Sequence, residues 1–423
     1  MPIFSNLDYK KILLVAGFVV ICLALIFLMY WLFFRATPPG PGEPGYVPPG
    51  GVLPDTKEGG QPGVIEPGSG LPSAGDIEED ETKDSGPSEV ARGDDTLVLP
   101  ITQNRVLNPT LSANKQGINY WDKEDQLFYR ISPDGQSRLP LSDEKFFGVE
   151  KVTWSEDSTQ AIITYPDELN VFYDFSTKEK TTLPKEVVGA SFNSSGKEIA
   201  FKFVTADPNS NFIAVSSPNG SGAELIEPIG AEADKVQVVI SPTEEVVALY
   251  AKPTSLDSSE IFFIGRSGEN FKSLNVEGMH IKGLWSPSGN RLLYHSVSAS
   301  HDYKPNLWIV DARGDNIGNH HFDLNLETWV DKCIFSSETE LYCAVPKNLP
   351  EGSGLYADEI TGYSDEIYKI DLTTGRKELI ASPVLDQAGG SQFRMTNLEI
   401  SEDGHFLFFW DQITEKVYSM RLR

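Results

Sequence analysis

A short phrase recurs seven times between residues 109 and 409 of this 423-residue chain. Each copy has an apolar or aromatic residue, a Ser or Asn, a small polar turn and then a run of apolar residues. The residues that open the turns are Ser112, Ser155, Asn193, Ser241, Ser286, Ser336 and Ser401, at intervals of 38 to 65 residues. Such spacing indicates one supersecondary unit that is repeated, because each unit buries its apolar faces only against its neighbours.

Each unit can be divided into antiparallel strands. In the fifth copy, residues 281–285 and 291–297 flank the turn Ser286-Pro-Ser-Gly, and residues 307–311 follow as a third strand. Pro suits the second position of such a turn and Gly the fourth. Four strands in about 40 to 50 residues are typical of one blade of a β-propeller. The repeats therefore predict an all-β fold, a seven-bladed β-propeller over residues 96–423.

The seventh unit has three evident strands, at residues 397–400, 406–410 and 416–422. We expect its fourth strand to come from the start of the domain. There, Thr96-Leu-Val-Leu-Pro-Ile-Thr resembles the fourth strand of the preceding unit, Lys377-Glu-Leu-Ile-Ala-Ser-Pro. Pairing this N-terminal strand into the last blade removes an open sheet edge and closes the ring.

Residues 12–34 carry no charge and are long enough to cross a bilayer as one transmembrane helix. The run ends in aromatic residues and Arg35, which favours a retained anchor. A cleaved signal peptide, the other interpretation, has a shorter apolar region and a small-residue cleavage site. Lys10 and Lys11 precede the span. The positive-inside rule then leaves residues 1–11 as a cytoplasmic tail and places the propeller outside the cell membrane, as a single-pass protein.

Residues 35–95 are rich in Pro, Gly and acidic residues and lack a strict collagen period. This composition predicts a disordered linker that lifts the following domain off the membrane. A role as a ligand for a proline-binding module is the alternative. We prefer the spacer, because this segment is expected outside the cell.

The chain has 61 acidic and 35 basic residues, a net charge of −26. So acidic a surface argues against nucleic acid as a partner and against close docking on anionic lipid. No nucleophile elbow, zinc-binding His-Glu-x-x-His, Cys-x-x-Cys pair or phosphate-binding loop is found. The acidic neighbours Asp122, Glu124 and Asp125 lack the spacing of a calcium loop and are expected to form a turn. We predict no catalytic residue, no metal and no cofactor.

The segment Trp285-Ser-Pro-Ser-Gly-Asn-Arg-Leu-Leu-Tyr, followed by Leu307-Trp-Ile-Val-Asp, resembles the WD40-like (PD40) repeat of TolB-type bacterial propellers. The resemblance covers residues 96–423 at motif level and no part of residues 1–95. TolB proteins are soluble periplasmic propellers that work through protein partners, so the resemblance implies the propeller fold and a bias toward protein binding. This chain departs from them in its expected anchor and linker.

One position is polar in nearly all units when the repeats are aligned. Three residues before each apolar anchor lie Asn108, Lys151, Gly189, Gln237, Lys282, Lys332 and Asn397. First strands line the central channel of a propeller, so we hypothesise a polar, locally cationic ring that binds an anionic ligand group. Ordinary solvated strand starts are the plainer interpretation.

Two other features stand out near the sixth turn. Cys333 and Cys343 flank it, either as a cross-strand disulfide or, slightly favoured, as two small buried thiols. The insertion at residues 346–365, with Tyr356 and Tyr363, is the longest surface feature. It is predicted either as a partner-contact loop or as a variable loop without function.

These features favour a membrane-anchored, extracytoplasmic protein-binding or scaffolding module of the cell envelope, with another envelope protein as its partner. An enzyme of the lyase or hydrolase type that uses polar residues of the channel is the alternative. A purely structural role in a surface complex is the third interpretation.

Overall fold

The structure, a computed structural model, describes residues 86–386 and 388–423. The predicted tail at 1–11, the predicted transmembrane helix at 12–34 and most of the predicted linker lie outside the described residues. Over the described ranges, no helix has both the length and the apolar character needed to span a membrane.

Five separate four-stranded antiparallel sheets account for most of the described chain. Their strands are β2 (Val106–Leu111), β3 (Ile118–Asp122), β4 (Leu127–Ile131) and β5 (Arg138–Pro140); β6 (Lys151–Trp154), β7 (Gln160–Thr164), β8 (Asn170–Asp174) and β9 (Lys180–Thr182); β10 (Val187–Phe192), β11 (Ile199–Phe203), β12 (Phe212–Ser216) and β13 (Glu224–Pro228); β14 (Val236–Val238), β15 (Val246–Ser255), β16 (Ser258–Gly265) and β17 (Leu274–Glu277); β18 (Met279–Trp285), β19 (Arg291–Val297), β20 (Pro305–Asp311) and β21 (Phe322–Asp323).

The remaining strands form one eight-stranded sheet in the order β22-β23-β24-β25-β1-β28-β27-β26. They are β1 (Asp95–Pro100), β22 (Cys333–Ser337), β23 (Glu340–Pro346), β24 (Asp365–Asp371), β25 (Lys377–Val384), β26 (Met395–Ile400), β27 (Phe406–Asp411) and β28 (Lys416–Arg421). Short 3₁₀ turns connect strands: η1 (Pro208–Ser210), η2 (Ala233–Lys235), η3 (Ala299–His301), η4 (Gly314–Asn316), η5 (Val330–Lys332) and η6 (Ala357–Glu359).

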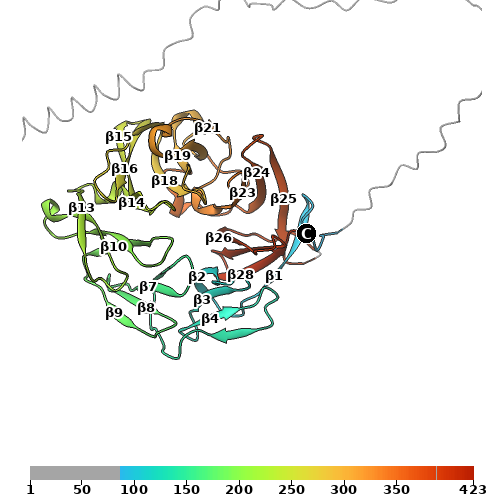
Figure 1. Cartoon of the computed structure of the whole chain (residues 1–423). Helices are drawn as coiled ribbons and strands as arrows, with labels where there is room; N and C mark the ends of the chain where they lie inside the picture. Colours follow the sequence, from blue (N-terminus) through green and yellow to red (C-terminus); the bar gives the residue numbers. More distant parts are fainter. Residues whose placement is uncertain (1–85, 387) are drawn as a thin grey trace, which may run out of the picture. The chain divides into compact units, whose positions relative to one another are not determined.

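The sheets are arranged radially in a ring, with the first strand of each sheet nearest the centre (Figure 1). Neighbouring inner strands contact one another from β26 to β2, β6, β10 and β14, while β15 and η5 make the contacts with β18. Between adjacent sheets lie separate apolar clusters, such as Trp121 and Phe128 against Val152 and Ile163. This is the architecture of a β-propeller, so the predicted all-β propeller fold is confirmed.

The repeated Ser has a structural role in the turn between the first two strands of a unit. In four of the units the Ser hydroxyl accepts a hydrogen bond from the backbone N–H five residues later, as Ser286 does from Arg291 N at 3.2 Å and Ser401 from Phe406 N at 2.9 Å. Asn193 does the same with its amide oxygen. Ser286 is fully buried. The side chain therefore satisfies a backbone donor that the tight turn leaves without a strand partner.

The predicted closing strand is present as β1. Its second half pairs antiparallel with β28, from Val98 opposite Met420 to Pro100 opposite Tyr418. Its first half pairs in parallel with β25, from Asp95 opposite Ser382, which the sequence did not predict. A single strand thus holds together the outer edges of two neighbouring sheets.

The folded part begins before residue 96, where the sequence had placed the end of the linker. Ala91 and Gly93 donate backbone hydrogen bonds to Arg421 and Ile380, at 2.9 and 2.8 Å. Ala91 also packs against the apolar cluster that contains Val98. The Pro, Gly and acidic composition of this stretch predicted a linker. Its ordered structure depends on contacts with residues far away in the sequence, which composition does not reveal.

Cys333 and Cys343 are directly opposite each other on β22 and β23 and are joined by a disulfide in this structure. Both residues are buried. A register shift next to Phe335 brings them into the same pair, which sequence counting across the turn could not establish. The slightly favoured interpretation, two separate thiols, is therefore not what the structure shows.

We expect Val98→Ala to destabilise the propeller by about 2 kcal/mol, because Val98 is 1% exposed and packs in the core between the two joined sheets. Leu99→Ala is the matched control, since its side chain on the opposite face of β1 is 65% exposed. Chemical denaturation of the full chain in a detergent with uncharged head groups measures both. Equal stability of the two variants would contradict the closing role of β1.

Candidate functional site

Three residues of the predicted polar ring connect neighbouring inner strands. The Asn108 side chain accepts a hydrogen bond from Val152 N at 2.9 Å, which joins β2 to β6. The Gln237 side chain forms two hydrogen bonds with the backbone of Gly283, which joins β14 to β18. Asn397 donates to Pro109 O at 3.4 Å, from β26 to β2. These side chains therefore stabilise the ring of strands and are not free to bind a ligand.

Backbone geometry explains why three of these positions carry Asn or Gly. Asn108, Gly189 and Asn397 have φ angles of 40°, 64° and 48°. Each lies within a register shift between the first two strands of its sheet. The left-handed region is accessible to Gly at no steric cost and to Asn at a small one. The alignment thus detected a structural bulge at these positions.

Lys332 does not line a channel mouth, in contrast to the prediction. It belongs to η5, is 3% exposed and forms an ion pair with Asp365 at 2.7 Å. Its ammonium also donates to Met395 O at 3.1 Å. The prediction counted three residues back from each apolar anchor and assumed a strand at that position. In this unit the position falls in a 3₁₀ turn before β22, so a buried structural lysine was assigned to the ring.

Lys151 and Lys282, two further residues of the predicted ring, lie on the first strands of different sheets, β6 and β18. Lys151 keeps surface exposed to solvent and has no carboxylate within ion-pair distance among the described residues. Protein around its ammonium and the nearby charge of Lys282 lower the pKa of Lys151. Lys282 itself lies 3.4 Å from Asp331, in a half-exposed pair.

A third lysine, Lys202 on β11, joins them and was missed by the sequence analysis. Its Cε lies only 3.5 Å from the position that a Cβ on Gly189 would occupy, so it fills the space left by the ring residue without a side chain. Its ammonium donates to Ala233 O at 2.8 Å. Burial lowers the pKa of Lys202, and the charge of Lys151 lowers it further. The sequence feature that could have indicated this residue is a single Lys within the otherwise apolar strand at residues 199–203.

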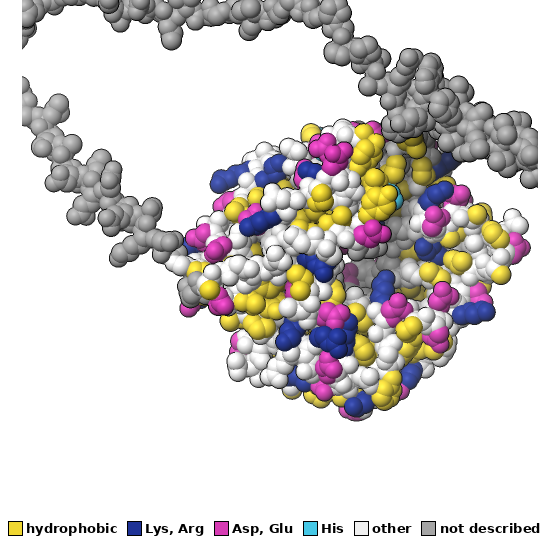
Figure 2. All heavy atoms as spheres, turned by 180° about the vertical axis from the view of Figure 1, so that it is seen from behind, with side chains coloured by type: hydrophobic (Ala, Val, Ile, Leu, Met, Phe, Trp, Pro, Cys, Tyr) yellow, Lys and Arg dark blue, Asp and Glu magenta, His cyan; other side chains and the backbone are white. Residues whose placement is uncertain are grey.

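We call Lys151, Lys202 and Lys282 the channel lysines. Lys151 is near enough to Lys282 and to Lys202 for their like charges to act on each other, and the three residues belong to three sheets. Figure 2 shows a hollow in the middle of one face of the ring, with basic and acidic side chains beside it. Asp331 and Asp234 offset part of this charge. Mutual repulsion and partial burial make the cluster favourable for an anion, which would stabilise all three charged forms.

The insertion at residues 346–365 is packed against the domain along part of its length. Tyr363 is 8% exposed and packs with Trp329 and Leu349. Gly354 donates to Tyr303 O at 2.9 Å. Tyr363 is thus a core residue and not a contact residue, whereas Tyr356, at 61% exposure, remains available to a partner.

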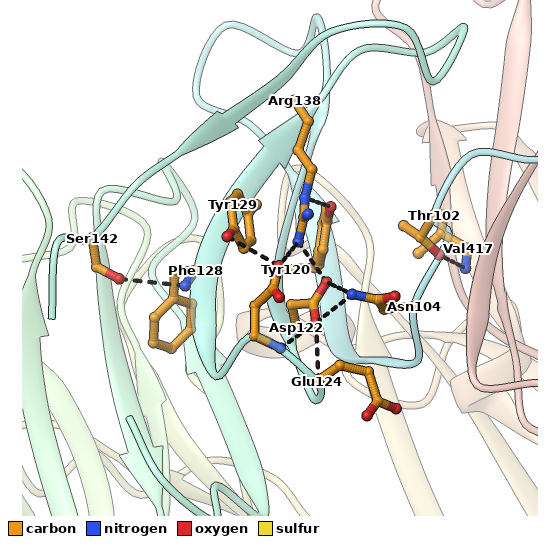
Figure 3. Close-up of polar contacts among 11 residues, drawn as sticks. Thr102, Asn104, Tyr120, Asp122, Glu124, Phe128, Tyr129, Arg138, Ser142 and Val417 are labelled. Carbon is orange, nitrogen blue, oxygen red and sulfur yellow. Dashed lines mark hydrogen bonds and ion pairs between the residues drawn. The ribbon is translucent and has the colours of Figure 1, made fainter. Parts of the chain in front are cut away.

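The acidic neighbours at the end of β3 form a turn, as expected, and Figure 3 shows their contacts. Asp122 accepts hydrogen bonds from Glu124 N at 3.0 Å and Asp125 N at 2.9 Å. Its second oxygen lies 2.6 Å from Arg138, whose guanidinium also covers the ring of Tyr129. The Asp122 carboxylate is therefore occupied by turn and sheet contacts.

Glu399 on β26 forms another contact around the ring. It accepts hydrogen bonds from Thr110 Oγ1 at 3.3 Å and Leu111 N at 3.4 Å, on β2. Burial raises the pKa of Glu399 from 4.5 to about 7. Its carboxyl group therefore holds a proton more tightly than an exposed glutamate does, at the contact between the last inner strand and the first.

No protein family and no curated protein matches the sequence. Solved structures do match. The β-propeller domain of Cps50 (Swd1) from Myceliophteria thermophila has a TM-score of 0.51 at 13% identity, over 77% of this chain and 100% of that one. A chain of the mitotic checkpoint complex has a TM-score of 0.50 at 15% identity, over 85% and 98%. The tricorn protease has a TM-score of 0.49 at 11% identity, and the match spans only 34% of its length and 77% of this chain. At such identities the likeness shows the propeller fold alone.

We expect Glu399→Gln to be more stable than the parent chain at pH 8, by up to about 2 kcal/mol. The folded pKa of Glu399 is raised, so the folded state binds the proton more tightly and the parent loses stability as pH rises from about 4.5 to about 7. The glutamine has no proton to lose. Denaturation curves of both proteins at pH 4 and pH 8 test this. A difference that is the same at both pH values would contradict it.

Proposed function

We propose that this chain is a non-catalytic binding module of the cell envelope, which holds an anionic group of its ligand on the channel lysines. The observation that carries the proposal is that Lys151 has no ion-pair partner among the described residues, while Lys202 and Lys282 from two other sheets add their positive charge near it. The protein has a net charge of −26, so most of its surface does not attract anions. A local group of lysines at the channel is therefore a distinct feature of that place.

We also infer that the propeller has seven blades. The eight-stranded sheet divides into β22–β25 and a second set of four, β26–β28 with β1, and the five separate sheets supply the rest. In this interpretation β1 is the fourth strand of the last blade, as the repeat spacing predicts. The TolB-like form of the repeats remains part of the proposal, as does protein binding by the loop-bearing faces.

The proposed location is outside the cell membrane, with the N-terminus in the cytoplasm. The uncharged run at residues 12–34 and the positive residues before it support a single-pass anchor. The disulfide between Cys333 and Cys343 supports an oxidising compartment for the propeller. Another envelope protein is the proposed partner, and the exposed Tyr356 is a candidate contact for it.

Calorimetric titration of the full chain with citrate, a compact trianion, tests the anion site. The triple variant Lys151→Met, Lys202→Met and Lys282→Met is expected to weaken citrate binding by about tenfold or more. The matched control changes three exposed lysines in the connections between strands, with Lys145→Met, Lys185→Met and Lys197→Met, and is expected to change affinity by less than about twofold.

The pH dependence gives a second readout in the same titration. Since the pKa values of Lys151 and Lys202 lie below the ordinary 10.5, citrate affinity should begin to fall at a lower pH than free lysine would require. Equal losses of affinity in the channel and control triple variants would contradict a specific site.

A further inference from the structure

Three consecutive connections on one side of the ring form hydrogen bonds with one another or with the adjoining strand ends. Each connects the second and third strands of its sheet: the end of the β15–β16 hairpin at residues 253–258, the loop at residues 298–304 between β19 and β20, and the insertion at residues 347–364 between β23 and β24. Because these sheets have the same strand order from the inside outward, the three connections lie on the same side of the ring (Figure 1). We call them together the loop platform.

Two carboxylates join the sheet of β15 to the loop of the next sheet. Asp257 Oδ1 accepts a hydrogen bond from Ala299 N at 2.8 Å, and Glu277 at the end of β17 accepts one from the hydroxyl of Ser300. The backbone of Asp257 also accepts a hydrogen bond from Gly278 N at 2.9 Å. β15 has ten residues where β3, β7 and β11 have five, and this length carries the hairpin end to the neighbouring loop.

Backbone hydrogen bonds join the same loop to the insertion. Gly352 N donates to Asp302 O at 2.8 Å, and Gly354 N donates to Tyr303 O at 2.9 Å. Asp302 and Tyr303 have φ angles of 53° and 52°, a left-handed backbone that persists where surrounding contacts hold it. A Cβ on Gly354 would lie 2.9 Å from Tyr303 O, so glycine permits this close approach. The loop platform is thus preformed, which lowers the entropic cost of binding a partner.

Two large apolar side chains are exposed on the loop platform, in its first and third segments. Leu256 is 87% exposed at the end of the hairpin, and Tyr356 is 61% exposed in the insertion. Single exposed apolar residues are common on protein surfaces. Here both belong to segments that are held together through the loop at residues 298–304, and Tyr is among the residues most often found at the energetic centre of protein interfaces.

The exposed charges of the loop platform are mainly acidic. Asp302, Glu351 and Glu359 are exposed and form no ion pair in the part of the chain that the structure describes. The two lysines of these segments do not offset them, because Lys304 and Lys347 are each paired with a glutamate outside the platform. Unpaired carboxylates beside exposed apolar residues are complementary to a partner that carries basic and apolar side chains together.

We propose that the loop platform is the docking surface for a protein partner that presents arginine or lysine residues around apolar side chains. One exposed lysine, Lys252, lies next to the hairpin end and offsets one carboxylate, which leaves the platform acidic. The inference rests on the proposed binding of another envelope protein and names the place and the charge of that contact. It does not involve the channel lysines.

Fluorescence anisotropy of labelled peptides tests the proposal on the full chain in uncharged detergent, with the signal of micelles alone subtracted. The first peptide alternates Arg and Leu, the second Glu and Leu, and the third Arg and Ser. We expect the first to bind and the other two to bind at least about tenfold more weakly, because one has the wrong charge and the other lacks apolar side chains.

The first set of variants tests the charge of the surface. Reversal of three platform carboxylates, with Asp302→Lys, Glu351→Lys and Glu359→Lys, should weaken binding of the Arg/Leu peptide by about tenfold or more. The matched control makes the same change in net charge at exposed residues of other connections, with Glu156→Lys, Asp315→Lys and Glu402→Lys, and should have less than about a twofold effect.

The second set tests the apolar contacts. Leu256→Ser with Tyr356→Ser should weaken binding of the Arg/Leu peptide by about tenfold. Leu139→Ser with Phe322→Ser is the matched control, since these residues are 58% and 54% exposed on the outermost strands β5 and β21, and it should leave the affinity within about twofold.

Equal binding of the three peptides, or equal effects of the platform and control variants, would overturn the proposal. So would light scattering that shows a dimer of the parent chain and a monomer of the platform variants, because the occupant would then be a second copy of the chain. Citrate binding should be unchanged in all these variants, so a failure of the loop platform is distinguished from a failure of the anion site.

Discussion

The whole structure depends on closing a ring of sheets whose inner strands touch. A ring of radially arranged sheets avoids exposed, unpaired ends only if the last sheet meets the first. Two kinds of contact close the ring here. On the outside, β1 pairs with both β25 and β28. On the inside, Asn397 and Glu399 of β26 form hydrogen bonds with residues of β2. Because these contacts join residues about 290 positions apart, their formation requires the intervening sheets to be in place.

The same constraint separates structural from functional residues at the channel. Buried backbone groups of the inner strands need hydrogen-bond partners, so polar side chains on these strands connect one strand to the next. Asn108, Gln237 and Asn397 are used in this way, and Lys332 neutralises a buried Asp365. Lys151 is different, since it has no ion-pair partner among the described residues. A ligand site is therefore best sought where a charge remains after the contacts of the ring are satisfied.

The repeated turn predicted the strands well, because its Ser, Pro and Gly each satisfy a local requirement of the backbone. The strand at residues 291–297 was predicted with the bounds of β19. What depended on distant contacts was predicted less well. Tyr363 looked like a surface residue because its partner Trp329 is 34 positions away, and Lys202 was missed because only the structure places it over Gly189.

The central claim, that the channel lysines form one anion site, is tested most directly by anomalous diffraction from crystals soaked in selenate. The account predicts a selenium peak within about 4 Å of the ammonium groups of Lys151 and at least one of Lys202 and Lys282, with no equivalent peak at the exposed lysines of the outer strands. An empty channel in crystals that bind selenate elsewhere would contradict it.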